Sequence, residues 1–352
     1  MKKTAYINGI GAVTAQGVWS ERLLVDATEL QQAIAPVQHP SYKEMISPAM
    51  VRRMSNGIKM GIYASQQALD EAEIAMPDAI VAGTGLGCLE DSEKFLRNIL
   101  DNDEQFLTPT AFIQSTHNTV ASQIALRLQC KAYNFTYVHR SVSFESALLD
   151  ALLQLQSGEA THILAGASDE ISDHTYSLLQ QIGYIKQDGI QESVKNSTSV
   201  GVNYSEGAVF FGLSTNKMAH TYAEIVDVRI QNDVNQAQLK DFVALFLQEN
   251  NVTIEEMDAL ILGINGDIES DQYYTRLLAD FEAVPTVYYK HLIGQFDSSS
   301  AFGLAVASQL LKHQELPKQL FWQEQERKNF RYVLLYNQFK GKDHSLVLLR
   351  AC

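Results

Sequence analysis

Short apolar runs and longer amphipathic segments alternate along this chain. Residues 4–14, TAYINGIGAVT, are rich in β-branched and aromatic side chains and predict an opening strand that leads into a turn at Gly9 and Gly11. Residues 47–74 place apolar side chains at a period of about 3.6 residues, which predicts one helix with an apolar face. Residues 78–91 predict a strand that ends in the loop GTGLG. This order of strand, helix and strand is typical of a layered α/β fold.

The second half of the chain repeats the style of the first. Residues 255–281 and 284–312 each predict a strand, a turn and a helix, and residues 330–352 predict a closing hairpin. We therefore expect a pseudo-duplicated five-layer α/β/α/β/α sandwich. Its N-terminal half would span residues 1–215, and a shorter C-terminal half would span residues 216–352.

Composition and charge narrow the classes of partner and cofactor. The 27 lysines and arginines against 41 aspartates and glutamates give a formal charge of -14, which disfavours nucleic acid as a partner. The three cysteines lie far apart without ligand spacing, so we expect neither a disulfide framework nor a metal site. GTGLG lacks the third glycine of a dinucleotide motif, and no cofactor is expected. No apolar run reaches the roughly 18 residues of a membrane span, which favours a cytoplasmic protein.

The stretch 135–170 predicts a strand, the abrupt turn HRSVS, a buried helix and a second strand. Such a turn usually presents a nucleophile. Five motifs along the chain resemble those of β-ketoacyl-acyl carrier protein synthases, in the same order: INGIGAVTAQG, GTGLG, TPTAFIQSTHNTVASQIAL, SGEATHILAGASDE and YSEGAVFFGL. The resemblance covers essentially the whole chain and implies the thiolase fold.

The resemblance also implies an active site of one cysteine and two histidines. The cysteine thiolate at a helix N-terminus takes an acyl chain as a thioester, and the histidines stabilise the enolate and oxyanion. Counting back from Gly158, which resembles the glycine at the end of the family's helix, places Ser141 at the cysteine position. Asn265 in LGINGD and Gln295 in KHLIGQ stand at the histidine positions, whereas Lys290 is retained.

These replacements predict that the catalytic set is not intact. Asn265 and Gln295 can fill the space of a histidine, but an amide takes up no proton near neutral pH. A serine at a helix start usually caps the helix, and we expect this role for Ser141. His139 lies two residues before Ser141, and His291 directly follows Lys290, but neither stands where the family's mechanism needs a histidine.

A synthase-like chain without its catalytic residues resembles a chain-length factor. The resemblance implies a heterodimer with an active ketosynthase in polyketide, aryl polyene or fatty-acid-like synthesis, with the strand near residues 132–138 at the interface. It also implies that the acyl carrier protein docks through the partner, because carrier proteins are acidic like this chain.

Side-chain bulk would then decide the length of the acyl chain. Phe112, His117 and Phe144 are candidates to line or plug a pocket between the subunits, and Phe144 replaces a family glycine. Phe339 resembles the family's gating phenylalanine, although Lys340 replaces a loop glycine beside it. Core packing is the competing interpretation for each of these side chains.

Two other classes of function stay open. In one, Ser141 or Ser143 accepts an acyl group, and the chain is a serine-dependent acyltransferase or condensing enzyme. In the other, the chain forms a homodimer that binds acyl ligands.

Overall fold

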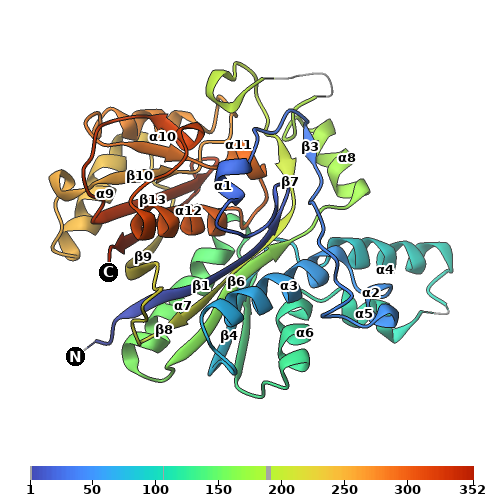
Figure 1. Ribbon diagram of the computed structural model, residues 1–352. Helices are drawn as coiled ribbons and strands as arrows, with labels where there is room; N and C mark the ends of the chain where they lie inside the picture. Colours follow the sequence, from blue (N-terminus) through green and yellow to red (C-terminus); the bar gives the residue numbers. More distant parts are fainter. Residues whose placement is uncertain (1, 106, 188–191) are drawn as a thin grey trace.

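Two sets of strands with the same order and directions make up most of one large sheet (Figure 1). The computed structural model describes residues 2–105, 107–187 and 192–352. The first set runs in the order β1 (Ala5–Thr14), β8 (Gly207–Ser214), β6 (His162–Asp169), β4 (Ala79–Gly83) and β5 (Tyr133–Tyr137). The second runs in the order β9 (Ala223–Asn232), β14 (Asp343–Arg350), β13 (Tyr332–Phe339), β10 (Ala259–Leu262) and β11 (Thr286–Tyr288).

The strand directions repeat as well as the order. In each set the second strand is antiparallel to both the first and the third. The third, fourth and fifth strands are parallel to one another. The sets join where β1 pairs with β9 between Ala5 and Ile7. Four short strands lie outside this repeat: β2 (Gly17–Val18) pairs with β1, β12 (Phe321–Gln323) pairs with β11, and β3 (Ile34–Ala35) pairs with β7 (Tyr204–Ser205).

Helices fill the middle and cover both outer faces of the two strand sets (Figure 1). The central helices, α7 (Ser143–Ser157) and α12 (Ser300–His313), share one apolar core with both sets. The outer face of the first set packs against α3 (Asn56–Glu71) and α6 (Thr119–Leu128), and that of the second against α9 (Leu239–Glu249) and α10 (Gln272–Leu278). The predicted five-layer sandwich is confirmed.

The remaining helices are mostly short. The α-helices are α1 (Leu23–Asp26), α2 (Pro48–Val51), α4 (Leu89–Asp101), α5 (Pro109–Gln114), α8 (Asp173–Gln181) and α11 (Lys290–Ile293). The 3₁₀ turns are η1 (Arg140–Val142), η2 (Val194–Asn196), η3 (Gln236–Gln238), η4 (Ile254–Glu256) and η5 (Lys318–Leu320). Across the described ranges, no helix has the length and hydropathy that a membrane crossing requires.

The structure corrects the predicted turn at Gly9 and Gly11. Both glycines lie inside β1. Glycine is needed there because α3 packs directly on this strand. A Cβ atom at Gly11 would lie 2.0 Å from the carbonyl oxygen of Ala64, and one at Gly9 would lie 2.2 Å from that of Ala68. The chain turns later, at Ala15 and Gln16, and the φ of +97° at Gly17 directly after this turn favours glycine.

The single helix predicted over residues 47–74 is also wrong, because the chain breaks between α2 and α3. Ser55 adopts an extended backbone, with φ -63° and ψ 167°. The buried Glu170 carboxylate accepts a hydrogen bond of 2.5 Å from the Gly57 N–H, so a long-range contact fixes the start of α3.

Candidate functional site

The turn between β5 and α7 forms a tight elbow, as the sequence predicts. Arg140 lies in it at φ +50°, a left-handed conformation that is uncommon for residues other than glycine. The Ser143 hydroxyl closes the turn, since it accepts a hydrogen bond from the His139 N–H and donates one to the Arg140 carbonyl, both 2.7 Å long. The elbow sits against Gly83 of β4, where a Cβ atom would lie 2.6 Å from the Ser143 backbone.

Ser141 is buried in the elbow but does not cap the helix. Its Oγ donates a hydrogen bond of 3.2 Å to Asp343 Oδ2 at the start of β14. The capping role predicted for Ser141 is therefore wrong, because its hydroxyl turns toward the other strand set. The Ser143 hydroxyl instead hydrogen-bonds to the backbone of the elbow, at the His139 N–H and the Arg140 carbonyl.

Arg140 faces a buried pair of carboxylates. Its Nη1 lies 3.7 Å from Asp297 Oδ2, which follows the turn after α11. Burial, and then the charge of Asp169, raise the pKa of Asp297 to about 7. Asp169 itself is satisfied, since its oxygens accept hydrogen bonds from Ser298 and from the loop after β4. The elbow thus presents a guanidinium group to the acidic interior.

Asn265, Gln295 and Lys290 meet in one hydrogen-bonded cluster. The Lys290 ammonium donates to Gln295 Oε1 at 2.8 Å and to Asn337 Oδ1 at 3.0 Å. The Asn265 amide nitrogen donates to the same Gln295 oxygen at 3.3 Å. We refer to these four residues as the amide cluster. The Gln295 oxygen therefore accepts hydrogen bonds from a buried ammonium group and from the Asn265 amide at once.

Lys290 is only 2% exposed, and its charge is balanced by nearby acids. Burial lowers the pKa of Lys290 to about 8, against the carboxylates of Asp271 and Glu145, which favour its charged form. Glu145 lies fully buried on α7, and its Oε1 accepts a hydrogen bond of 2.8 Å from the Ser345 hydroxyl. Burial raises the pKa of this carboxyl group.

Asp271 fixes the turn that carries Asn265. Its Oδ1 accepts a hydrogen bond of 3.2 Å from the Asn265 N–H, and its Oδ2 accepts one of 2.8 Å from the Gly266 N–H. Burial raises the pKa of Asp271 to about 7. Asp271 is therefore a positioning residue for the amide cluster.

No group of His, Cys, Asp or Glu side chains in the described part of the chain is arranged to hold a metal ion.

The four aromatic or histidine side chains predicted to shape a pocket occupy different environments. Phe144 is fully buried in the central core, where its ring lies 5.8 Å from that of Phe211. Phe112 on α5 is 55% exposed, and His117 is exposed after the same helix. Phe339 is half-buried at the end of β13, where its ring lies 6.0 Å from that of Tyr184.

The loop after β13 carries a cation next to this aromatic pair. Lys340 Nζ lies 4.8 Å from the centre of the Tyr184 ring and 5.8 Å from that of Phe339. Both distances lie within the range of a cation–π contact. Lys340 also borders a cavity of about 400 Å³ together with Tyr184 and Tyr273.

The buried His291 on α11 makes the stability of the fold sensitive to acid. Its ring stacks on Tyr288 with the centroids 3.8 Å apart, and burial lowers its pKa to about 3. In the unfolded chain this ring takes up a proton near pH 6.5, so the free energy of unfolding falls as the pH drops from 6.5 toward 3. At pH 5.5 we expect a loss of about 1.4 kcal/mol from this residue. Chemical denaturation at pH 7.5 and 5.5 should show that His291→Phe removes this part of the loss.

The exposed His313 supplies the matched control, and His313→Gln should retain the pH dependence of the original chain. An equal loss of stability in His291→Phe and in the original chain would contradict the expected role of His291.

Comparison with known proteins places this geometry among solved structures. The family model described as "Beta-ketoacyl synthase, N-terminal domain" matches residues 28–219. No curated protein sequence matches the chain. The structure described as "The ishigamide ketosynthase/chain length factor" has 16% identity and a TM-score of 0.83, with 100% of both chains covered. A β-ketoacyl synthase from Burkholderia phymatum STM815 gives the same identity, coverage and TM-score.

A further similar structure is a two-protein assembly, the ketosynthase ApeO in complex with its chain length factor ApeC from Xenorhabdus doucetiae. It has 14% identity and a TM-score of 0.78, with 99% of this chain and 98% of that chain covered. At these identities the likeness shows the fold, and the predicted thiolase fold is confirmed.

Proposed function

Because this chain belongs to the β-ketoacyl synthase family, we propose that it is a non-catalytic, chain-length-factor-like subunit that pairs with an active β-ketoacyl-acyl carrier protein synthase. The amide cluster carries this proposal. Asn265 and Gln295 stand where the family's histidines are expected; they hydrogen-bond to each other, and Gln295 also accepts a hydrogen bond from Lys290. At the two histidine positions the site has amides, which make polar contacts but exchange no proton near neutral pH.

The size of the expected defect supports the same proposal. A positioned general acid or base contributes roughly 10² to 10⁴ in rate, and two such groups are replaced here. Ser141 offers a hydroxyl in place of a thiolate, and a hydroxyl is a much weaker nucleophile than a thiolate. Phe144 fills the core behind the elbow with a large ring. Condensation by this chain alone is therefore disfavoured at each step.

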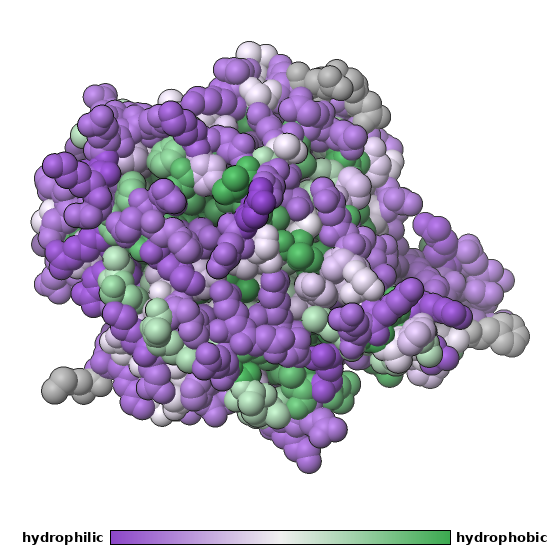
Figure 2. Space-filling model, viewed as in Figure 1, coloured by the Kyte–Doolittle hydropathy of each residue, from purple (hydrophilic) through white to green (hydrophobic). Residues whose placement is uncertain are grey.

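An exposed edge strand supports pairing with another subunit. β5 ends the described sheet, and Tyr133, Phe135 and Val138 on or next to it are 45 to 47% exposed. Figure 2 shows hydrophobic residues reaching the surface in the lower part of the view, where Figure 1 places α6 and β4, the strand that pairs with β5. Unpaired apolar edges invite association. We propose that the partner synthase adds its own strand here.

The proposed subunit would act on product length through its bulky side chains. Phe112 is exposed on α5 and is available to a neighbouring pocket, with His117 close to it in sequence. Phe144 and Phe339 would limit the space on this chain's own side. The net charge of -14 favours docking of an acidic carrier protein on the partner. The product would belong to polyketide, aryl polyene or fatty-acid-like synthesis.

One contact favours a second candidate function. The Ser141 hydroxyl donates to the Asp343 carboxylate at 3.2 Å, an arrangement in which Asp343 could accept the proton of an attacking serine. The chain would then be a serine-dependent acyltransferase or condensing enzyme. A homodimer that binds acyl ligands would use the same edge strand without a catalytic partner.

Intact-mass analysis separates these candidates. The purified chain is incubated with acyl-loaded acyl carrier protein, alone and together with a co-expressed synthase from the same genome. We expect an acyl adduct on the synthase and none on this chain, because Ser141 lacks the family's thiolate. An adduct on this chain that Ser141→Ala removes would establish the serine mechanism instead. Failure of every co-expressed synthase to form a stable complex would contradict the subunit role.

A further inference from the structure

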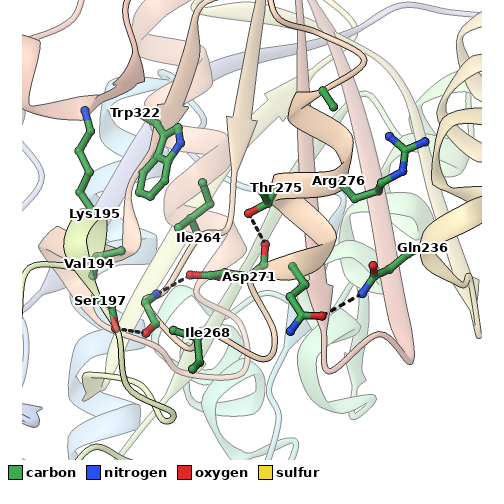
Figure 3. A pocket seen from close by; sticks show the side chains of 13 residues that line it. Val194, Lys195, Ser197, Gln236, Ile264, Ile268, Asp271, Thr275, Arg276 and Trp322 are labelled. Atoms are coloured by element: carbon green, nitrogen blue, oxygen red, sulfur yellow. Dashed lines mark hydrogen bonds between the residues drawn. The ribbon is translucent and has the colours of Figure 1, made fainter.

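A second cavity, of about 570 Å³, lies next to the turn that carries Asn265 (Figure 3). Residues of this turn, α10, η2 and β12 form its walls, and Asn265 itself is not among them. The volume falls within the range of small-molecule sites, roughly 300 to 1,000 Å³. Neither the amide cluster nor the proposed pairing uses this space.

Apolar and aromatic groups form much of the cavity wall. Trp322 of β12 stands at one end, with Ile264 below it in the view of Figure 3. Val194 and Ile268 add further apolar surface. Trp322 is held in place by an edge-to-face contact with Tyr288, at 5.5 Å between the ring centroids. A flat apolar ligand would find a fixed ring and aliphatic side chains in this space.

The charged groups at the cavity favour an anion. Lys195 Nζ lies 5.9 Å from the centre of the Trp322 ring, and no carboxylate in the described residues forms an ion pair with it. Arg276 lines the other end and shares the Asp280 carboxylate with Lys240, at 3.3 and 3.2 Å. Arg276 is therefore the cation of the wall at that end, and the acid that pairs with it lies outside the lining.

The cavity wall has one acidic side chain, Asp271, against the two basic side chains of Lys195 and Arg276. The two oxygens of Asp271 already accept hydrogen bonds from the backbone N–H groups of Asn265 and Gly266. A cationic lining is unusual on a chain with a net charge of -14. The Lys195 ammonium donates a hydrogen bond of 3.5 Å to the Phe321 carbonyl but forms no ion pair within the described residues. A cation of this kind beside an aromatic wall matches a ligand that combines a planar ring with a negative charge.

We propose that this cavity is a binding site for a planar aromatic carboxylate, with its ring beside Trp322 and its carboxylate at Lys195. The ring would replace water against Trp322 and Ile264, and the carboxylate would form a charge-assisted hydrogen bond with the lysine. This assignment is independent of the subunit role, since it uses none of the residues at the elbow or on β5.

Isothermal titration of the full-length chain with 1-naphthoate tests the site. We expect saturable binding with one ligand per chain. The neutral analogue 1-naphthylmethanol should bind at least 10-fold more weakly because it lacks the charge, and decanoate should bind more weakly because it lacks the ring. Equal affinity for naphthoate and naphthylmethanol would overturn the anionic assignment, and tighter binding of decanoate would overturn the aromatic one.

Variants locate the binding to this cavity. Lys195→Gln should weaken naphthoate binding at least 5-fold, and Thr275→Trp should abolish it because the new ring fills the space. Lys217→Gln, at an exposed lysine outside the cavity, should bind like the original chain. If Thr275→Trp lowers the melting temperature, Ala279→Trp at another exposed position of the wall replaces it. Unchanged binding in a folded tryptophan variant would rule out this site.

Discussion

A partner synthase reconstituted with this chain should make its product at an unchanged rate when Ser141 is replaced by alanine here. Omitting the chain, or replacing the nucleophilic cysteine of the partner by alanine, should reduce product formation by roughly 10³-fold or more, because only the partner carries a thiolate. The buried Ser141 hydroxyl contributes one hydrogen bond to Asp343, so its removal is small in volume and should not prevent pairing. Product formation from a carrier-bound malonyl unit, followed by mass spectrometry of the released chains, gives both rate and length.

Ser143→Ala serves as the control for local damage. The Ser143 hydroxyl makes two hydrogen bonds within the elbow, so Ser143→Ala should lower the stability of this chain. The partner's catalytic residues are unchanged in this variant. A loss of product with Ser141→Ala that matches the loss with the partner's cysteine variant would contradict a non-catalytic role for this chain.

Phe135→Asp should abolish pairing with the synthase and, with it, product formation. Phe135 is 46% exposed on β5, and its ring lies 4.9 Å from that of Tyr137. In a paired edge this position would be covered, and burying an unpaired carboxylate there would weaken association by about 100-fold or more. Size-exclusion chromatography and sedimentation of the co-expressed proteins measure the change.

The matched control places the same charge elsewhere. Leu245 on α9 is 52% exposed on the outer face of the second strand set, and Leu245→Asp should leave the complex intact. The melting temperature of the isolated Phe135→Asp chain should stay close to that of the original, because the side chain is already exposed. A complex that survives Phe135→Asp would show that the partner binds another surface.

The order of the elements could be predicted because it depends on local periodicity and turn residues. Asn265, Gln295 and Lys290 follow from the family resemblance, and the structure brings them together, whereas no signal in the sequence indicated Asn337, the fourth member of the cluster. The sequence predicts a turn at Gly9 and Gly11 because glycine usually marks one, whereas in the structure the close packing of α3 requires glycine at both positions of a strand. Only a contact distant in sequence distinguishes the two cases.

The sequence indicates the burial of Glu145, an acid near Lys290, less directly. Glu145 precedes Leu148 and Leu152 by three and seven positions, so the apolar period of α7 places it on the buried face. A lone charge at such a position indicates a buried partner, but it does not identify Lys290 or Ser345. Likewise, Ser141 has the residue type and place of a cap, and only Asp343, 202 positions away, explains why its hydroxyl points elsewhere.

The shared acceptor in the amide cluster also bears on evolutionary reversal. Gln295 Oε1 accepts hydrogen bonds from Lys290 and from Asn265 at once. A neutral imidazole has one acceptor nitrogen and would have to serve a buried ammonium group and an amide with it. Under the proposed function, Gln295→His would therefore cost stability before a second histidine and a cysteine were present to supply chemistry. Selection would oppose this first step, and the amide cluster would persist in descendants.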